Sequence, residues 1–400
     1  MPLSTWRQIP RSIWALGLVS LCMDLSSELV HALLPLYMAT ALGASMLTIG
    51  IIEGIAEATA LVVKVFSGVI SDVFRRRKPL VVLGYGLAAI TKLIFPLAPT
   101  LSWIVGARFV DRVGKGIRGA PRDALIADIA PPRLRGAAFG LRQALDTVGG
   151  FGGPLLALAA MAWFAGDFQS AFWVAVIPAG LAVLLLLFAV EEPESASTVG
   201  AGKPRLRWVD AKRLPRAYWA VVAIASLLTL ARFSEAFLVL RAQNVGFSVA
   251  QAPWVMVVMS LVYALVAYPA GAAVDRGHGA RLLSTGLAAL VVSDLCLAFA
   301  STASWVLAGA ALWGLHMGLT QGLLAALVAG AAPADMRGTA FGVFNLACGV
   351  ALLIASGLAG WLWDAFGPRY TFMAGMLFAS IAWGALALGL PLNALKSGKR

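Results

Sequence analysis

The stretch RGAAFG at residues 135–140 recurs as RGTAFG at residues 337–342, an offset of 202 residues. Two further matches follow at nearly the same offset. GVISD at 68–72 recurs as GAAVD at 271–275, and the pair Ser27 and Glu28 recurs as Ser234 and Glu235. Ordered matches at one offset indicate a duplicated structural unit. The sequence therefore predicts two equivalent halves, residues 1–190 and 217–400, joined by a polar linker at 191–216.

The chain is strongly apolar throughout both halves. Of its 400 residues, 60% are hydrophobic and 12% are charged, and the mean hydropathy is +0.86, which excludes an ordinary soluble domain. Continuous apolar stretches of roughly 18–25 residues are each long enough to cross ~30 Å of hydrocarbon as a helix. We expect an all-α integral membrane protein with twelve transmembrane helices in two pseudo-symmetric six-helix halves. The expected spans lie near 12–40, 47–71, 79–98, 101–128, 135–163, 168–190, 217–245, 250–274, 279–300, 303–330, 337–364 and 369–391.

Basic residues are concentrated on alternate connections between these spans, at 75–78, 133–135, 203–216, 276–281 and 396–400. The positive-inside rule then places both termini and the linker in the cytoplasm. We expect a multi-pass protein of the inner (cytoplasmic) cell membrane whose surroundings are the lipid bilayer. The net charge of +12 reflects this orientation, so no nucleic-acid partner is expected. We also expect a monomer.

The loop after the second expected span resembles a signature of the major facilitator superfamily. The residues that carry this resemblance are Gly68, Asp72, Arg76, Arg77 and Lys78, with Asp275 and Arg276 at the equivalent place in the second half. The resemblance covers essentially the whole chain. It implies two six-helix bundles that rock about a central site, and a gating role for these residues.

Two further patterns resemble proton-coupled antiporters of that superfamily. Arg112, Gly116 and Ala120 resemble the motif of the fourth helix. Gly140, Gly149, Gly153 and Pro154 have the spacing of the fifth-helix motif, and the resemblance implies a gating role for the last three. Ala157 and Leu158 replace the glycine pair that closes the fifth-helix motif. The stretches SSELVHALLPLY and DRVGKGIRGAPRDALIAD resemble bacterial permeases of metal and drug resistance, including nickel exporters, although this chain has no histidine-rich tail.

One face of the expected helix 101–128 is charged. At 100° per residue, its charged residues fall within about 140° of the circumference: Arg108, Asp111, Arg112, Lys115, Arg118, Arg122 and Asp123. A charged face within the bilayer has to line water or meet opposite charges. Two interpretations stay open, structural ion pairs inside the bundle and direct contact with a proton or substrate.

The first expected helix places Asp24, Glu28 and His31 on one face, within about 60°. We expect proton coupling at Glu28 and Asp24, with Glu235 in the second half and Arg112 stabilising the ionised carboxylate. The expected substrate-binding residues are His31, Arg108, Asp111, Lys115, Arg232 and Asp146. Asp24, Glu28 and His31 could also hold a divalent metal. The competing interpretation of His31 is a hydrogen-bonded residue inside the bundle, since three ligands along one helix face need help from other helices to bind one ion.

These patterns predict a proton-coupled secondary active transporter that works by alternating access, and an antiporter exporting a small solute or a divalent metal cation in particular. Two alternatives stay open: a proton symporter that takes up an anionic solute or a metal chelate, and a membrane sensor that does not transport. No nucleophile, base and orienting group share one face, so we expect no enzymatic activity and no cofactor. An ATP-binding P-loop motif is also missing from the sequence, which favours coupling to an ion gradient.

Overall fold

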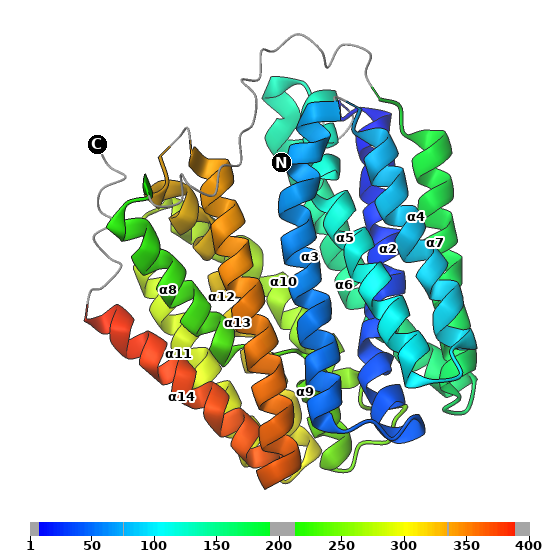
Figure 1. The fold of residues 1–400 in the computed structure, drawn as a ribbon, viewed down its shortest axis with the longest axis vertical. Coiled ribbons are helices and arrows are strands. Elements are labelled where there is room, and N and C mark those ends of the chain that lie inside the picture. The colour runs from blue at the N-terminus through cyan, green and yellow to red at the C-terminus, as the bar shows by residue number, and fades with distance from the viewer. Residues whose placement is uncertain (1–7, 75, 193–212, 334–335, 389–400) are drawn as a thin grey trace. The chain divides into compact units, whose positions relative to one another are not determined.

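The computed structural model describes residues 8–74, 76–192, 213–333 and 336–388, and every regular element in these ranges is helical (Figure 1). The chain divides into two compact units. Unit 1 comprises Met1–Leu34 and Thr59–Arg205, and unit 2 comprises Pro35–Ala58 and Leu206–Arg400. Most of the predicted linker, residues 193–212, lies outside the described residues.

The helices follow the expected spans closely in both halves of the sequence. The first half contains α2 (Arg11–Leu36), η1 (Tyr37–Ala41), α3 (Met46–Phe74), α4 (Lys78–Leu97), α5 (Leu101–Ile129), η2 (Pro132–Leu134), α6 (Arg135–Trp163) and α7 (Phe168–Ala189). The second half contains α8 (Arg216–Ala231), α9 (Ala236–Asn244), α10 (Trp254–Asp275), α11 (Gly279–Ala298), α12 (Ala303–Ala331), α13 (Arg337–Phe366) and α14 (Pro368–Ala387).

Eleven helical segments of the described chain are long and apolar enough to cross a membrane. The remaining expected span is α5, which has 29 residues and at 1.5 Å per residue is long enough to cross hydrocarbon. Because of its charged residues, α5 is not among the eleven segments that are apolar enough to be recognised as membrane spans. The expectation of twelve spans therefore holds for the helices, while α5 has to bury its polar face against neighbouring helices rather than lipid.

The expected span 217–245 is found as the membrane-spanning segment Arg216–Asn244, but it is not one continuous helix. It consists of α8 and α9, separated by an irregular stretch at 232–235. Side chains replace the missing helical hydrogen bonds there, because the Ser234 amide donates to Ser356 Oγ (3.1 Å) and the Ala236 amide donates to Ser234 Oγ (3.3 Å). The break contains Arg232 and Glu235, two of the predicted site residues.

Close approach of α4 and α5 within unit 1 depends on a pair of glycines. A Cβ built on Gly114 would lie 2.7 Å from the carbonyl oxygen of Gly84, and a Cβ on Gly84 would lie 2.7 Å from that of Gly114. Such small residues let two helix backbones touch inside a bilayer. The contact brings the charged face of α5 onto α4, beside which it runs in Figure 1.

The first turn of α3 packs on the end of α13 within unit 2. The Asp364 carboxylate accepts hydrogen bonds from the amides of Met46 (3.1 Å) and Leu47 (2.8 Å). It thereby satisfies two of the amides that a helix start leaves without partners. A Cβ on Gly360 would overlap the backbone of the same turn, so glycine is required at that position.

Candidate functional site

The charged face of α5 divides into two groups of side chains, both within unit 1. The first, which we name the Asp111 cluster, consists of His31, Lys92, Arg108, Asp111 and Arg112. Lys92 Nζ lies 2.7 Å from Asp111 Oδ1, and Arg112 Nη2 lies 3.1 Å from Asp111 Oδ2. Arg108 Nη1 lies 4.0 Å from the same carboxylate, and its Nη2 lies 2.8 Å from His31 Nδ1. Three bases therefore converge on one buried acid.

The Asp111 cluster is closed to solvent. Lys92 and Arg108 are each 1% exposed, and Asp111 is 2% exposed. Because a guanidinium can only donate, His31 Nδ1 accepts the hydrogen bond from Arg108. A buried ion pair of this kind tolerates the loss of one member poorly, since the other charge is left uncompensated. The geometry thus favours the structural interpretation for Arg108, Asp111 and Arg112.

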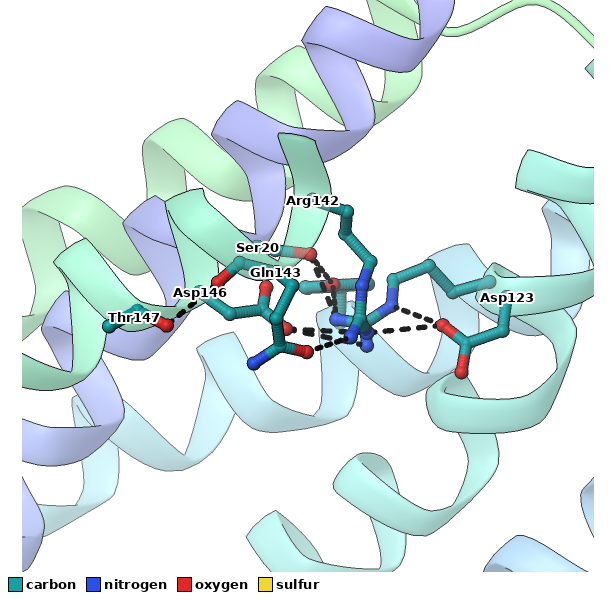
Figure 2. A network of polar contacts seen from close by, with 8 residues as sticks. Ser20, Asp123, Arg142, Gln143, Asp146 and Thr147 are labelled. Atoms are coloured by element: carbon teal, nitrogen blue, oxygen red, sulfur yellow. Dashed lines mark hydrogen bonds and ion pairs between the residues drawn. The ribbon is translucent and has the colours of Figure 1, made fainter. Parts of the chain in front are cut away.

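The second group, which we name the Asp24 cluster, lies on the later turns of α5 and on α2 and α6. Its members are Asp24, Arg118, Arg122, Asp123, Arg142 and Asp146. Figure 2 shows Asp123 and Asp146 on either side of the Arg142 guanidinium. Arg142 Nη1 lies 3.1 Å from Asp123 Oδ1 and 3.3 Å from Asp146 Oδ2, and Arg122 Nη2 lies 3.8 Å from Asp146 Oδ2. Arg122 also donates to Ser20 Oγ at 2.8 Å.

The Asp24 cluster contains three acids and three bases, and it is only partly satisfied. Among the described residues, Asp146 Oδ1, Arg118 Nη1 and Arg142 Nε are buried without a hydrogen-bond partner. Asp24 lies within electrostatic reach of Asp146, Arg118, Arg122 and Glu28. The cluster therefore combines equal numbers of acids and bases with buried polar atoms that have no partner of their own in the described chain.

Asp24 and Glu28 sit on consecutive turns of α2, directly against the glycines of α6. A Cβ on Gly149 would lie 2.8 Å from the Asp24 Cβ, and a Cβ on Gly153 would lie 2.5 Å from the Glu28 Cβ. Both acids are half-buried. No hydrogen bond or ion pair links either carboxylate to another residue in the described part of the chain. The predicted glycine motif therefore packs on the two predicted proton-coupling residues.

The predicted metal site does not form in this structure. Across the described ranges, no group of three or more His, Cys, Asp and Glu side chains is close enough to hold a metal ion. His31 lies against Arg108 instead of joining Asp24 and Glu28. The three side chains share a helix face, as the sequence indicated, but a cationic partner occupies the histidine nitrogen.

The predicted gating residues of the first half hold the ends of α4, α5 and α7 together. Arg77 Nε lies 2.6 Å from Asp128 Oδ2. Lys78 Nζ donates to the carbonyl oxygens of Leu187 (3.1 Å) and Val190 (2.6 Å) at the end of α7. Arg76 is exposed, and Gly68 faces the Ala120 side chain.

The other predicted gating and binding residues are more dispersed. The side chains of Asp72 and Asp275 lie outside the described residues. Arg276 and Lys115 are exposed, and Pro154 is buried within α6. In unit 2, Arg232 is half-buried at the end of α8, within electrostatic reach of Glu235.

Sequence reasoning missed several polar residues that complete the site. Lys92 pairs with Asp111, while Ser20 and Tyr85 bind Arg122. Asp294 is buried in α11. A single charged residue inside an apolar run was the available signal for Lys92 and Asp294, because such a residue is expensive in a bilayer and usually functional or paired. Ser20 and Tyr85 carried no such signal.

Comparison with known proteins gives the family. A sequence profile described as Major Facilitator Superfamily matches residues 16–351 and 225–398. The chain belongs to the Major Facilitator Superfamily. An uncharacterised MFS-type transporter of Methanocaldococcus jannaschii is 31% identical over 384 residues, covering 94% of each chain. The inner membrane transport protein YajR of Escherichia coli is 27% identical, covering 93% of this chain and 81% of its own.

A solved structure shows the same fold. A POT family transporter in complex with 5-aminolevulinic acid superposes with a TM-score of 0.78 at 15% identity, covering 99% of this chain and 100% of its own. At that identity the likeness concerns the fold alone. Membership of the Major Facilitator Superfamily makes this chain a multi-pass membrane transporter with a small-molecule substrate. It also supports the all-α fold predicted from the continuous apolar stretches.

Proposed function

We propose that this major facilitator protein is a proton-coupled antiporter that exports a small organic cation. The observation that carries the proposal is the pair of carboxylates on α2. Asp24 and Glu28 are half-buried in a membrane-spanning helix and have no hydrogen bond or ion pair in the described chain. Carboxylates in such positions mark proton and ion pathways in transporters.

Exchange follows from competition for one group. Glu28 can carry a proton or lie beside a cationic solute, and the two cannot share the same carboxylate charge. Release of a proton to the cytoplasm would therefore precede binding of the solute there, and a proton from outside would displace the solute. Because the proton gradient of a respiring cell membrane is directed inward, the coupled solute moves outward.

The Asp24 cluster would link protonation to helix movement. When Asp24 or Asp146 takes a proton, Arg118, Arg122 and Arg142 face one negative charge fewer and their pairing changes. These side chains come from α2, α5 and α6. The contacts of Gly149 and Gly153 with α2 let α6 respond at close range. Alternating access in transporters of this architecture depends on such relative movement of helices around the central site.

The charge of the solute is supported by what surrounds the two acids. A divalent metal is disfavoured because the described residues offer no three-ligand group. An organic cation needs only one carboxylate and an apolar surface, and α2 offers apolar neighbours around Glu28 such as Leu25 and Leu29. An anionic solute would be repelled by both α2 acids in their ionised form.

Reconstitution tests the proposal. The protein is placed in proteoliposomes that contain a pH-sensitive dye, and organic cations, divalent metals and organic anions are added one at a time. We expect proton movement opposite to an organic cation in the wild type and its loss in Glu28→Gln. Glu191→Gln is the matched control, since Glu191 is an exposed acid just after α7.

Three outcomes would contradict the proposal in whole or in part. Protons that travel in the same direction as an organic anion would make the protein a symporter. Ligand binding without flux would make it a sensor. Proton exchange for a divalent metal alone would overturn the assignment of the solute while leaving antiport in place.

A further inference from the structure

The duplication relates a buried lysine of unit 1 to a buried aspartate of unit 2. At the repeat offset of 202 residues, Lys92 of α4 corresponds to Asp294 of α11, and Asp111 of α5 corresponds to Trp313 of α12. The packing supports this correspondence, because Gly84 contacts Gly114 in unit 1 and the equivalent Gly286 accepts a hydrogen bond from His316 Nδ1 in unit 2. The buried ion pair of unit 1 is thus represented in unit 2 by an acid and an indole.

Asp294 has no partner of its own. Its side chain is 0% exposed, and neither carboxylate oxygen has a hydrogen-bond partner among the described residues. Burying a carboxylate anion without a partner is very unfavourable, whereas the neutral acid needs only a hydrogen-bond acceptor. Asp294 is therefore suited to the protonated form in this conformation.

An acceptor lies beside it at the break between α8 and α9. A Cβ on Gly375 of α14 would lie 2.7 Å from Asp294 Oδ2 and 3.1 Å from the carbonyl oxygen of Ala231. Ala231 is the last residue of α8, and no backbone amide outside the regular helix pattern donates to its carbonyl in the described chain. The absence of a side chain at Gly375 leaves a space that both the Asp294 carboxyl group and the Ala231 carbonyl oxygen border.

The surroundings of this space are apolar and aromatic. Phe233 approaches the same point on Gly375, within 3.0 Å of its Cε1. The Phe233 ring packs on Phe237, Trp313 and Phe372, each with ring centroids 5.5–5.6 Å apart. The helices α8, α11 and α14 that enclose the space lie side by side in unit 2 (Figure 1). These rings separate Asp294 from solvent in this conformation.

Most charged and titratable groups on the neighbouring elements have other partners or lie at the surface, although Arg232 Nη1 is buried without a hydrogen-bond partner in the described chain. His316 of α12 donates to Gly286, and Arg369 of α14 stacks on Phe299 at 4.2 Å. Arg241 of α9 donates to the carbonyl oxygens of Leu297 and Ala300. From the break itself, Arg232 is in electrostatic reach of Glu235, Glu57, Tyr263 and Cys348. On α10, Arg276 is exposed and the Asp275 side chain lies outside the described residues. None of the described groups forms an ion pair with Asp294.

We propose that Asp294 and the carbonyl end of α8 form a binding site for one proton, separate from the acids of α2. The proton sits on the Asp294 carboxyl group, which then donates a hydrogen bond to the Ala231 carbonyl. Broken helices in transporters use their free carbonyls for small cations in this way. Loss of the proton would create a buried anion facing a helix C-terminus, which is electrostatically unfavourable. Deprotonation therefore requires the break to open toward water.

Infrared difference spectroscopy on the full-length protein in nanodiscs tests the site without any substrate. We expect a carbonyl stretching band of a protonated carboxylic acid at neutral pH that is lost in Asp294→Asn and retained in Glu28→Gln. Gly375→Ala should shift this band, because the added methyl group would displace the carboxyl group. Gly384→Ala is the matched control on the same helix, since nothing lies within 4 Å of its Cβ position, and its spectrum should match that of the wild type.

A band that persists unchanged in Asp294→Asn would overturn the proposal. Should that variant fail to fold, an unshifted band in Gly375→Ala would overturn it equally. Repeating the measurement in sodium and in choline distinguishes the cation: disappearance of the band in sodium alone would assign the site to Na⁺ and contradict the proton. These results do not depend on transport, so failure of the proposed antiport at Glu28 would be seen separately.

Discussion

The helices α5 and α12 occupy the same place in the two repeats and solve the problem of crossing a membrane in different ways. Each helix has 29 residues, and α12 begins and ends 202 residues after α5 does. Among its buried residues, α5 has Arg108, Asp111, Arg112 and Arg118. The equivalent positions of α12 hold Ala310, Trp313, Gly314 and Thr320. Only α12 is apolar enough to be recognised as a membrane span by composition.

The difference shows where duplicated helices can diverge. In unit 1, Lys92 of α4 neutralises Asp111. Loss of either residue would leave the charge of the other buried without this partner. In unit 2, Trp313 stands at the position equivalent to Asp111, and Asp294 has no hydrogen-bond partner among the described residues. One repeat therefore uses its buried charge for structure, and we expect the other to keep its buried acid for proton binding.

The largest expected effect comes from breaking the pair in unit 1. Asp111→Leu leaves the Lys92 ammonium buried without its carboxylate, and we expect it to lower the free energy of unfolding by about 3–5 kcal/mol. The double variant Lys92→Met with Asp111→Leu should recover only part of this loss, because Arg108 and Arg112 also lose the Asp111 carboxylate. Thermal unfolding in detergent, analysed as a double-mutant cycle, measures the coupling.

The counterpart in unit 2 sharpens the comparison. Asp294→Leu replaces a buried acid that has no partner by an apolar side chain of similar size, so we expect a change near zero or a gain in stability. If Asp294→Leu destabilised the protein as strongly as Asp111→Leu, then Asp294 would have a structural partner and the contrast between the repeats would not hold.

The next prediction concerns the close contact of α6 with α2 and compares α6 with its equivalent in the second repeat, α13. A Cβ on Gly153 would lie 3.0 Å from both the Leu25 carbonyl oxygen and the Leu29 amide nitrogen of α2, and backbone atoms cannot move aside easily. The equivalent residue of α13 is Ala355. We expect Gly153→Ala to cost about 1–3 kcal/mol through overpacking and to reduce proton exchange in proteoliposomes.

A neighbouring glycine provides the control for that substitution. Nothing lies within 4 Å of a Cβ on Gly150, so Gly150→Ala should leave exchange intact and stabilise α6 by about 0.5–1 kcal/mol through helix propensity. If Gly150→Ala and Gly153→Ala lost proton exchange equally, then exchange would depend on the spacing of small residues in α6 and not on the contact of Gly153 with α2.

The sequence predicted the helices and the charged face better than it predicted their partners. The expected span 101–128 agrees with α5 to within one residue at its end, because apolar length and helical periodicity are local properties. The pairing of Asp111 with Lys92 joins two helices, and periodicity gives a face without saying which helix covers it. The break at 232–235 was missed because no glycine or proline marks it. One of its two side-chain hydrogen bonds has as acceptor Ser356, more than a hundred residues away.

The proximity of Asp24 and Glu28 to α6 was predictable only in part. Their shared face follows from their spacing, and the glycines Gly149 and Gly153 were singled out by the family motif. The contact of these glycines with the two acids depends on how α2 and α6 pack together. The exclusion of His31 from a metal site likewise depends on Arg108, whose place on α5 gave no indication of which acid or histidine it would bind.

A modest expected loss of stability tests whether α12 crosses the membrane without a buried ionic interaction. His316 is fully buried and donates from Nδ1 to the Gly286 carbonyl at 2.8 Å, while its Nε2 has no partner among the described residues. His316→Leu removes one hydrogen bond, and it also removes a nitrogen that is buried without a partner. We expect a loss of only about 1 kcal/mol in unfolding free energy, measured by the same thermal unfolding as for Asp111→Leu. A loss as large as that of Asp111→Leu would mean that His316 is charged in the bundle, and that α12 contains a buried ionic interaction like α5.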